Sequence, residues 1–206
     1  MPQSFALVTA PDVDAATELP AEPVDLTEAK AWTRVEQDFL DDDELIRGLI
    51  RSAREILQEM TGRLLLTQTW DLFLDGFPVC DQPIYMQRAP AASVTSISYV
   101  DEDGAIQVLA SDKYKIDLTT TPHRILPAYD QSWPTTRDEI QSVTVRAIYG
   151  YGKAKDVPEP LKSAIKLLVG HYYEHREDAE FMASGQMQTI PRGFKYLIAP
   201  FRVWGA

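Results

Sequence analysis

The chain contains 206 residues, of which 45% are hydrophobic and 25% are charged, with a single cysteine and a formal net charge of −11. This apolar fraction is enough for a folded core, so wholesale disorder is excluded. One cysteine excludes an internal disulfide framework and the zinc sites built from four cysteines. No apolar run approaches the ~20 residues of a membrane-spanning helix, and the start lacks the basic segment of a secretory signal.

The negative charge is concentrated near the start of the chain. Residues 1–45 hold twelve acidic residues against only Lys30 and Arg34, whereas acids and bases nearly balance in the remainder. Phosphate binding needs concentrated lysine and arginine, so tight nucleic-acid binding is disfavoured. Residues 1–25 contain four prolines and little periodicity, which predicts an extended N-terminal arm.

Two helices are predicted after the arm, near 27–35 and 41–61. Thr27 is the expected N-cap of the first. Acidic residues crowd the start of the second, where the helix dipole favours negative charge. Apolar residues then recur at helical spacing until Gly62. The face away from this apolar stripe carries Arg47, Arg51 and Arg54.

Residues 66–156 have the composition of an antiparallel β-rich insertion. Strands are predicted at 67–74, 93–100, 114–118 and 142–149. The Asp103-Gly104 dipeptide predicts a hairpin turn.

A third helix is predicted near 158–178, with an apolar perimeter broad enough to pack on several neighbours, the 41–61 helix among them. The expected fold class is therefore α+β. A single domain over 26–180 would hold a helical core (26–65 and 157–180) and the β-rich insertion, followed by a C-terminal segment, 181–206.

One short motif points to enzymatic chemistry. His171, Glu174 and His175 fit the H-x-x-E-H pattern of inverted zinc metallopeptidases, in which two histidines one helical turn apart bind Zn²⁺ and the glutamate acts as general base. A third ligand is hard to supply, since only 31 residues follow His175. A zinc-dependent hydrolase is kept as the alternative function. The other interpretation is a helix end whose histidines lie near exposed carbonyls.

The C-terminal segment is too apolar for a free tail. Phe194, Leu197, Ile198, Phe201 and Trp204 lie within eleven residues, with lysine and arginine between them. Two explanations remain open: the segment folds back onto its own domain, or it docks on another protein. Aromatic anchors with a basic surround suit the core and rim of an interface.

Several stretches in fixed order make the chain resemble the head–tail connector (adaptor) proteins of tailed bacteriophages, a family also found in phage-derived gene transfer agents. The most distinctive stretch is Leu168-Val169-Gly170-His171-Tyr172-Tyr173-Glu174. The full set comprises residues 26–30, 41–63, 67–70, 75–78, 94–97, 99–101, 124–125, 127–129, 133–134, 150–152, 157–160, 168–174, 176–177 and 191–202.

The resemblance implies a structural protein with no catalytic activity and no cofactor. Family members form a ring, commonly of twelve subunits, beneath the portal of the capsid, and they join the portal to a stopper or tail-completion protein around an axial DNA channel. It also implies localisation in the virion neck, after assembly in the bacterial host cytoplasm, and leaves open whether the particle is a phage or a gene transfer agent.

Two sets of residues gain expected roles from this resemblance. The portal-docking set is Phe194, Tyr196, Leu197, Ile198, Phe201, Arg202 and Trp204. The subunit or channel surface is expected to involve Asp41, Asp42 and Asp43, with Arg47, Arg51 and Arg54 on the opposing side. The alternative for this second set is a pair of solvated helix faces. DNA would pass the acidic channel without specific binding.

Overall fold

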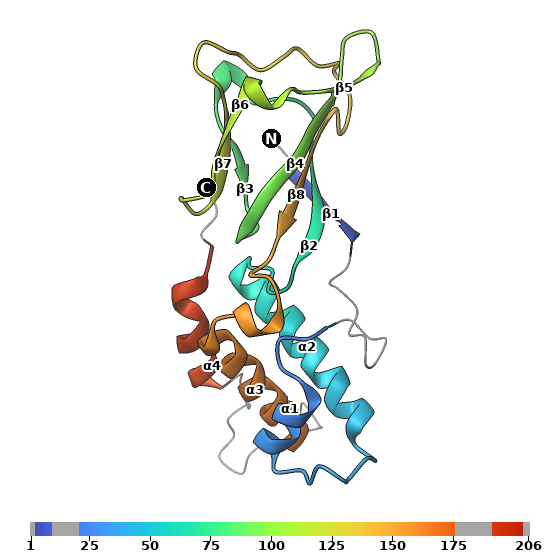
Figure 1. Ribbon diagram of the computed structural model, residues 1–206, viewed down its shortest axis with the longest axis vertical. Coiled ribbons are helices and arrows are strands. Elements are labelled where there is room, and N and C mark those ends of the chain that lie inside the picture. The colour runs from blue at the N-terminus through green and yellow to red at the C-terminus, as the bar shows by residue number, and fades with distance from the viewer. Residues whose placement is uncertain (1–2, 10–20, 176–190, 204–206) are drawn as a thin grey trace, which may run out of the picture. The chain divides into compact units, whose positions relative to one another are not determined.

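The computed structural model describes residues 3–9, 21–175 and 191–203. The chain forms two compact units, shown in Figure 1. The β unit comprises residues 1–20, 66–151 and 203–206, and the helical unit comprises 21–65 and 152–202. The assignment of the helical core (26–65 and 157–180) and the β-rich insertion (66–156) to one domain stays a prediction. The predicted α+β class is confirmed.

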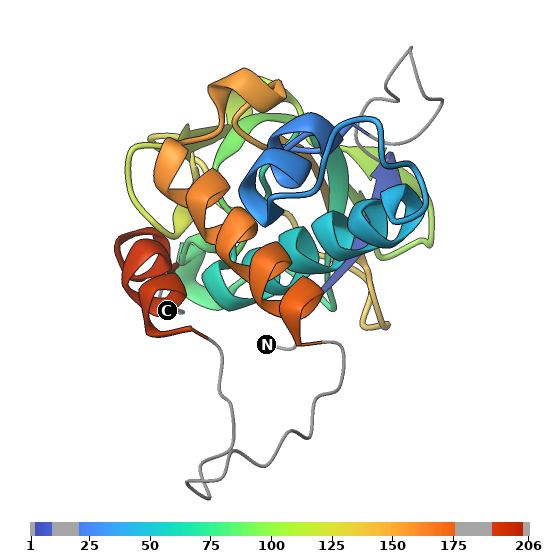
Figure 2. The same ribbon diagram turned by 90° about the horizontal axis from the view of Figure 1, so that it is seen from below.

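The helical unit is organised around its third helix. Its helices are α1 (Leu26–Thr33), α2 (Asp43–Thr61), α3 (Glu159–Glu174) and α4 (Arg192–Ile198). Helix α3 contacts each of the other three, as Figure 2 shows for α2 (cyan) and α4 (red) on its two sides. The predicted packing of α3 on α2 and its contact with several neighbours are confirmed. The buried apolar side chains include Ile46, Ile50, Leu57, Leu161, Ile165 and Leu168.

Helix ends explain where the predicted boundaries differ. Asp25, and not Thr27, caps α1, because the Asp25 carboxylate accepts the backbone N–H of Glu28 at 2.7 Å. Gly62 ends α2 with φ at 69°, as predicted. Helix α3 ends at Glu174, and the last turn predicted for it lies outside the described residues.

The β unit contains two antiparallel sheets. The first has five strands in the order β1 (Gln3–Thr9), β2 (Gln68–Leu74), β8 (Val143–Tyr149), β4 (Ala91–Val100) and β5 (Ile106–Val108). The second has the order β3 (Ile84–Met86), β7 (His123–Pro127) and β6 (Tyr114–Asp117). Buried side chains from both sheets form the core, among them Leu72, Ile84, Met86, Ile97, Ile125 and Val145. The predicted turn at Asp103-Gly104 joins β4 to β5.

The first strand, β1, lies in the part of the chain for which an extended arm was expected. It pairs with β2 from Gln3 opposite Leu74 onward. The guanidinium of Arg88 lies 5.6 Å from the ring centroid of Phe5 and 4.5 Å from that of Trp70. This pair of cation–π contacts fastens β1 to the sheet.

No helix of the described residues is both long enough and apolar enough to cross a membrane.

Candidate docking surfaces

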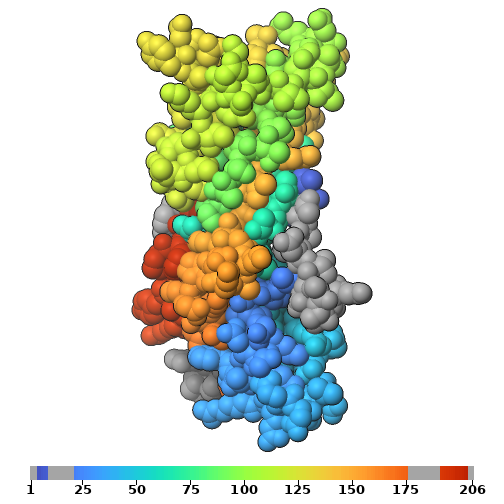
Figure 3. Space-filling view, viewed as in Figure 1, coloured from blue at the N-terminus to red at the C-terminus, as the bar shows by residue number. Residues whose placement is uncertain are grey.

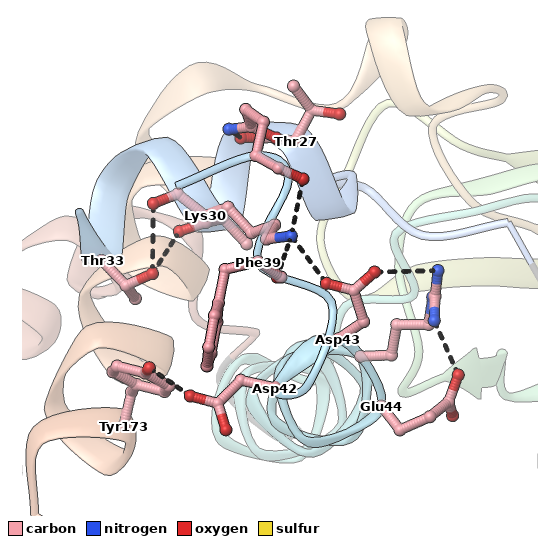
Figure 4. Close-up of polar contacts among 11 residues, drawn as sticks. Thr27, Lys30, Thr33, Phe39, Asp42, Asp43, Glu44 and Tyr173 are labelled. Atoms are coloured by element: carbon pink, nitrogen blue, oxygen red, sulfur yellow. Dashed lines mark hydrogen bonds and ion pairs between the residues drawn. The ribbon is translucent and has the colours of Figure 1, made fainter. Parts of the chain in front are cut away.

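A buried lysine organises the acidic start of α2. Lys30, on α1, is 1% exposed, and its ammonium lies 2.7 Å from a carboxylate oxygen of Asp43. The same ammonium donates to the main-chain carbonyls of Gln37 at 3.0 Å and Phe39 at 2.7 Å (Figure 4). Three acceptors around one cation fix the connection between α1 and α2, because each is otherwise costly to bury.

The acidic residues expected at a subunit or channel surface differ in their surroundings. Asp43 is largely enclosed, with 15% of its side chain exposed. Asp42 accepts a hydrogen bond from the hydroxyl of Tyr173 on α3 (Figure 4). Asp41 is exposed. Of the three residues, Asp41 is therefore the most exposed to solvent.

The arginines of α2 also separate into different environments. Arg47 lies 2.6 Å from Glu44 and 3.9 Å from Asp43, so it joins the acidic cluster. Arg54 pairs with Glu22 at 2.8 Å, where both side chains are mostly enclosed. Burial raises the pKa of the Glu22 carboxyl, and the guanidinium of Arg54 opposes that shift. Arg51 is exposed.

Exposed apolar side chains lie at the end of α1 and on the connection from α1 to α2. Trp32 is 48% exposed, Phe39 45% and Leu40 68%. Trp32 lies along α3, because a Cβ on Gly170 would come within 3.2 Å of its indole nitrogen. Three exposed acids lie among them, Glu36, Asp38 and Asp41, with one exposed base, Arg34. The exposed residues of 32–41 are called the acidic connection surface.

The docking segment predicted at the C-terminal end has one face turned inward. Phe194 is 0% exposed and Ile198 is 2% exposed, and α4 contacts α3. Both side chains belong to the core of the helical unit, so the structure removes these two residues from the expected docking set. Their i, i+4 spacing places them on one helix face.

Other side chains of α4 and of the residues that follow it are exposed. Tyr196 is 78% exposed, Leu197 is half-buried, and Arg192, Lys195 and Arg202 are exposed. These five residues form the α4 outer surface, which has three basic groups and no acidic one among residues 191–203. Trp204 lies outside the described residues.

Phe201 anchors the end of this segment to α2. It lies in the short 3₁₀ helix Ala199–Phe201. The side chain of Arg63, just after α2, donates to the Phe201 carbonyl, and its guanidinium lies 5.9 Å from the Phe201 ring centroid. Phe201 is half-buried.

The zinc motif falls at the end of α3. The rings of His171 and His175 do share one face, with centroids 5.2 Å apart in an edge-on arrangement. Among the residues that the structure describes, no group of three histidine, cysteine, aspartate or glutamate side chains gathers as a metal site. Nothing in the geometry supports the zinc hydrolase alternative.

Sequence reasoning missed Lys30 and Arg63, the two cations that hold these surfaces in place. Lys30 is one of two bases in the acidic first 45 residues, which was the available signal for a buried ion pair. The contact of Arg63 with Phe201 joins residues 138 positions apart, and no local sequence pattern predicts it.

Charged surfaces that include exposed aromatic and apolar side chains are typical of proteins that act by contacting other macromolecules. Residues 23–109 match the family described as Phage gp6-like head-tail connector protein. The recognition of the head–tail connector family from sequence is thereby confirmed.

Three solved chains share the fold over nearly the whole length. One, described as the virion of a native gene transfer agent particle, has a TM-score of 0.75 and 21% identity, covering 98% of this chain and 96% of that one. Another comes from the neck of an empty gene transfer agent particle computed with C6 symmetry, with a TM-score of 0.73, 21% identity and coverages of 98% and 97%. A third comes from the neck of a native particle computed with C12 symmetry, with a TM-score of 0.72, 23% identity and the same coverages, 98% and 97%. No curated protein matches the chain in sequence.

Proposed function

We propose that this chain is a structural subunit of the head-to-tail connector of a phage or phage-like particle. The subunits form a ring under the portal, join it to a stopper or tail-completion protein, and line the DNA exit channel. The observation that carries this proposal is the family match over residues 23–109, in a chain whose fold matches neck proteins over 98% of its length. Necks computed with C6 and C12 symmetry support a cyclic ring, and we favour twelve subunits.

Particles made without this chain test the proposal. We expect them to package DNA but to lose it or to fail to take a tail, and we expect the wild-type chain supplied in trans to restore both properties. Particles with normal tails and retained DNA would refute the connector role. Electron microscopy of the neck provides the second test, since the proposal requires cyclic symmetry there.

The α4 outer surface is the part we assign to portal contact. Its exposed tyrosine and three bases fit an anchor-and-rim arrangement, and the buried Phe194 and Ile198 hold the helix in position behind it. Repetition around a closed ring makes modest contacts act together through effective concentration.

A matched pair of tyrosine variants tests this assignment. Tyr196→Ala should weaken binding to the portal while leaving thermal unfolding unchanged, because Tyr196 is 78% exposed. Tyr129→Ala, at a tyrosine that is 93% exposed in the β unit, should leave portal binding intact. Equal portal binding by both variants would contradict the assignment.

The acidic connection surface is our candidate for the channel lining. An acidic wall repels the DNA backbone and keeps it from adhering during ejection, and each subunit carries a net charge of −11. Asp41→Lys should slow DNA release from particles without destabilising the chain, and Asp112→Lys in the β unit is the matched control. Equal release rates in both variants would remove Asp41 from the channel.

A further inference from the structure

Within the part of the chain that the structure describes, the five-stranded sheet has two edges with no further strand, formed by different strands. Strand β1 lies at one edge and β5 at the other. A sheet edge presents unpaired N–H and C=O groups, and proteins usually protect such edges with charge, proline or a covering segment. Neither edge strand contains charge or proline, since β1 reads Gln-Ser-Phe-Ala-Leu-Val-Thr and β5 reads Ile-Gln-Val. The protections present are a register shift between Leu7 and Thr9 in β1 and the three-residue length of β5.

The hydrogen bonds of the β4–β5 hairpin show which groups of β5 face outward. Asp101 donates to the carbonyl of Ala105 at 3.0 Å, and Leu109 donates to that of Ile97 at 2.8 Å. Inward-facing groups alternate along a strand, so residues 105, 107 and 109 face β4. The N–H and C=O of Ile106 and Val108 therefore point away from the sheet.

The side chains at this edge are exposed as well. Ile106 is 78% exposed and Val108 is 70% exposed, and Figure 3 shows the β4–β5 hairpin (bright green) on the visible surface. Two β-branched residues with open backbone groups are suited to accept another strand.

Strand β1, at the opposite edge, also has exposed apolar side chains. Leu7 is 47% exposed and Val8 is 43% exposed, and among the described residues β1 pairs with β2 alone. One row of directly paired residues, one from each strand, crosses the whole sheet from β1 to β5. The row consists of Ser4, Phe73, Thr144, Ser98 and Val108. Side chains in one row share a face, so a sheet added at β5 continues the face on which Ser4 lies.

We propose that β5 of one subunit pairs with β1 of a second copy of this chain, so that the five-stranded sheets join into one sheet around the ring. This inference rests on the proposed ring. A closed ring needs two different complementary surfaces on each subunit, one for each neighbour. The two unlike open edges of one sheet meet that need, whereas a different partner protein would have to cover both.

The strand directions predict the geometry of the junction. All neighbouring strands in the sheet are antiparallel, so the first and fifth strands run in the same direction. Sheets related by rotation around a ring keep that direction from one subunit to the next. The junction between β5 and β1 of the next copy is therefore a parallel pair, whose hydrogen bonds are evenly spaced and slanted.

A proline at an outward-facing position of β5 tests the pairing between subunits without removing a hydrogen bond within the subunit. Val108→Pro removes an N–H that points away from β4, so the hairpin keeps its own hydrogen bonds. We expect Val108→Pro to reduce ring assembly at least tenfold, measured by native mass spectrometry of the full chain and by neck occupancy in particles. Val108→Thr keeps the N–H and the branched side chain, and should assemble like wild type.

Cross-linking provides a measurement that does not depend on proline. In a Cys80→Ser background, which removes the exposed native thiol, Ser4→Cys with Val108→Cys should give a ladder of linked subunits with a short bismaleimide. Neither single substitution should give more than traces of dimer. Strong dimers from Val108→Cys alone would indicate pairing of β5 with itself and would overturn the proposal.

The failures of the two proposals are distinguishable. Rings that form in Val108→Pro as in wild type, or rings without a ladder, refute strand pairing and leave the connector ring intact. A neck without cyclic symmetry in wild-type particles refutes the ring, and strand pairing is refuted with it.

Discussion

Replacing Lys30 with methionine should be among the most damaging single changes in the helical unit. The ammonium of Lys30 has three acceptors, the Asp43 carboxylate at 2.7 Å and two main-chain carbonyls at 2.7 and 3.0 Å. Lys30→Met keeps the length and apolar character of the stem but leaves these acceptors without their donor. Removing one partner of a buried ion pair costs about 3–5 kcal/mol.

Two features of the structure reduce this cost. Asp43 is 15% exposed and keeps Arg47 at 3.9 Å, and its position at the N-terminus of α2 stabilises a negative charge. We therefore expect the free energy of unfolding to fall by about 2–4 kcal/mol. For a unit of this size, with a urea dependence of about 1.5 kcal/mol/M, the midpoint of unfolding falls by about 1.3–2.7 M.

Urea unfolding followed by circular dichroism at helical wavelengths measures this change. Lys155→Met is the matched control, because Lys155 is an exposed lysine of the same unit and its loss changes the net charge equally. The control midpoint should move little. A shift in Lys30→Met no larger than in the control would refute the claim that this cation holds the α1–α2 connection.

Three further predictions concern the β unit and α2. Burial raises the pKa of Tyr149 above its ordinary value near 10, so wild-type stability should fall above about pH 10, by up to ~1.4 kcal/mol per pH unit, because only the unfolded chain ionises there. Tyr149→Phe should reduce that slope in pH-dependent unfolding and leave the part due to Tyr114, whose pKa burial also raises. Since the buried Tyr149 hydroxyl has no partner among the described residues, the variant should also add about 1 kcal/mol of stability at neutral pH. Arg88→Ala should lower the free energy of detaching β1 (Gln3–Thr9) from the sheet by about 1–2 kcal/mol. Amide hydrogen exchange in β1 should then be about five- to thirtyfold faster. Gly150→Ala should lower stability by more than ~2 kcal/mol, since φ is +115° and the new Cβ would meet backbone. In contrast, Gly48→Ala, within α2 and with open space around it, should raise stability by about 0.5–1 kcal/mol in thermal unfolding.

Each of these has an opposing outcome. An unchanged alkaline slope in Tyr149→Phe would mean that another group carries it. Amide exchange in β1 as slow in Arg88→Ala as in wild type would mean that strand pairing alone attaches β1 to the sheet. Equal effects of alanine at Gly150 and Gly48 would contradict the backbone argument.

The sequence predicted the longer elements well, because long periodic segments repeat their signal. Helices α2 and α3 and strands β2 and β8 were all predicted within a few residues of their observed bounds. Strands β3 and β5 have three residues each, too few for alternation to be visible. Strand β1 was missed because its apolar residues do not alternate with polar ones and prolines flank it.

The candidate surfaces remain predictions. The sequence singled out the apolar C-terminal segment for docking, but its residues were treated as one set. Helical spacing within it separates Phe194 and Ile198, which face inward, from Tyr196, which faces outward. That separation was accessible from sequence once a helix was assumed. The engagement of Asp43 by Lys30 was not, because it depends on the path of the connection between α1 and α2.

The interleaving of the two units along the chain has a consequence for biosynthesis. The helical unit draws its core from α2 near the start and from α4 near the end, so Ile198 must leave the ribosome before that core is complete. Residues 66–151, which hold seven of the eight strands, emerge earlier. The sheets are therefore free to form first, while the apolar faces of α1 and α2 remain exposed. Before α3 and α4 have been synthesised, the incomplete helical unit is the part of the nascent chain most dependent on chaperones.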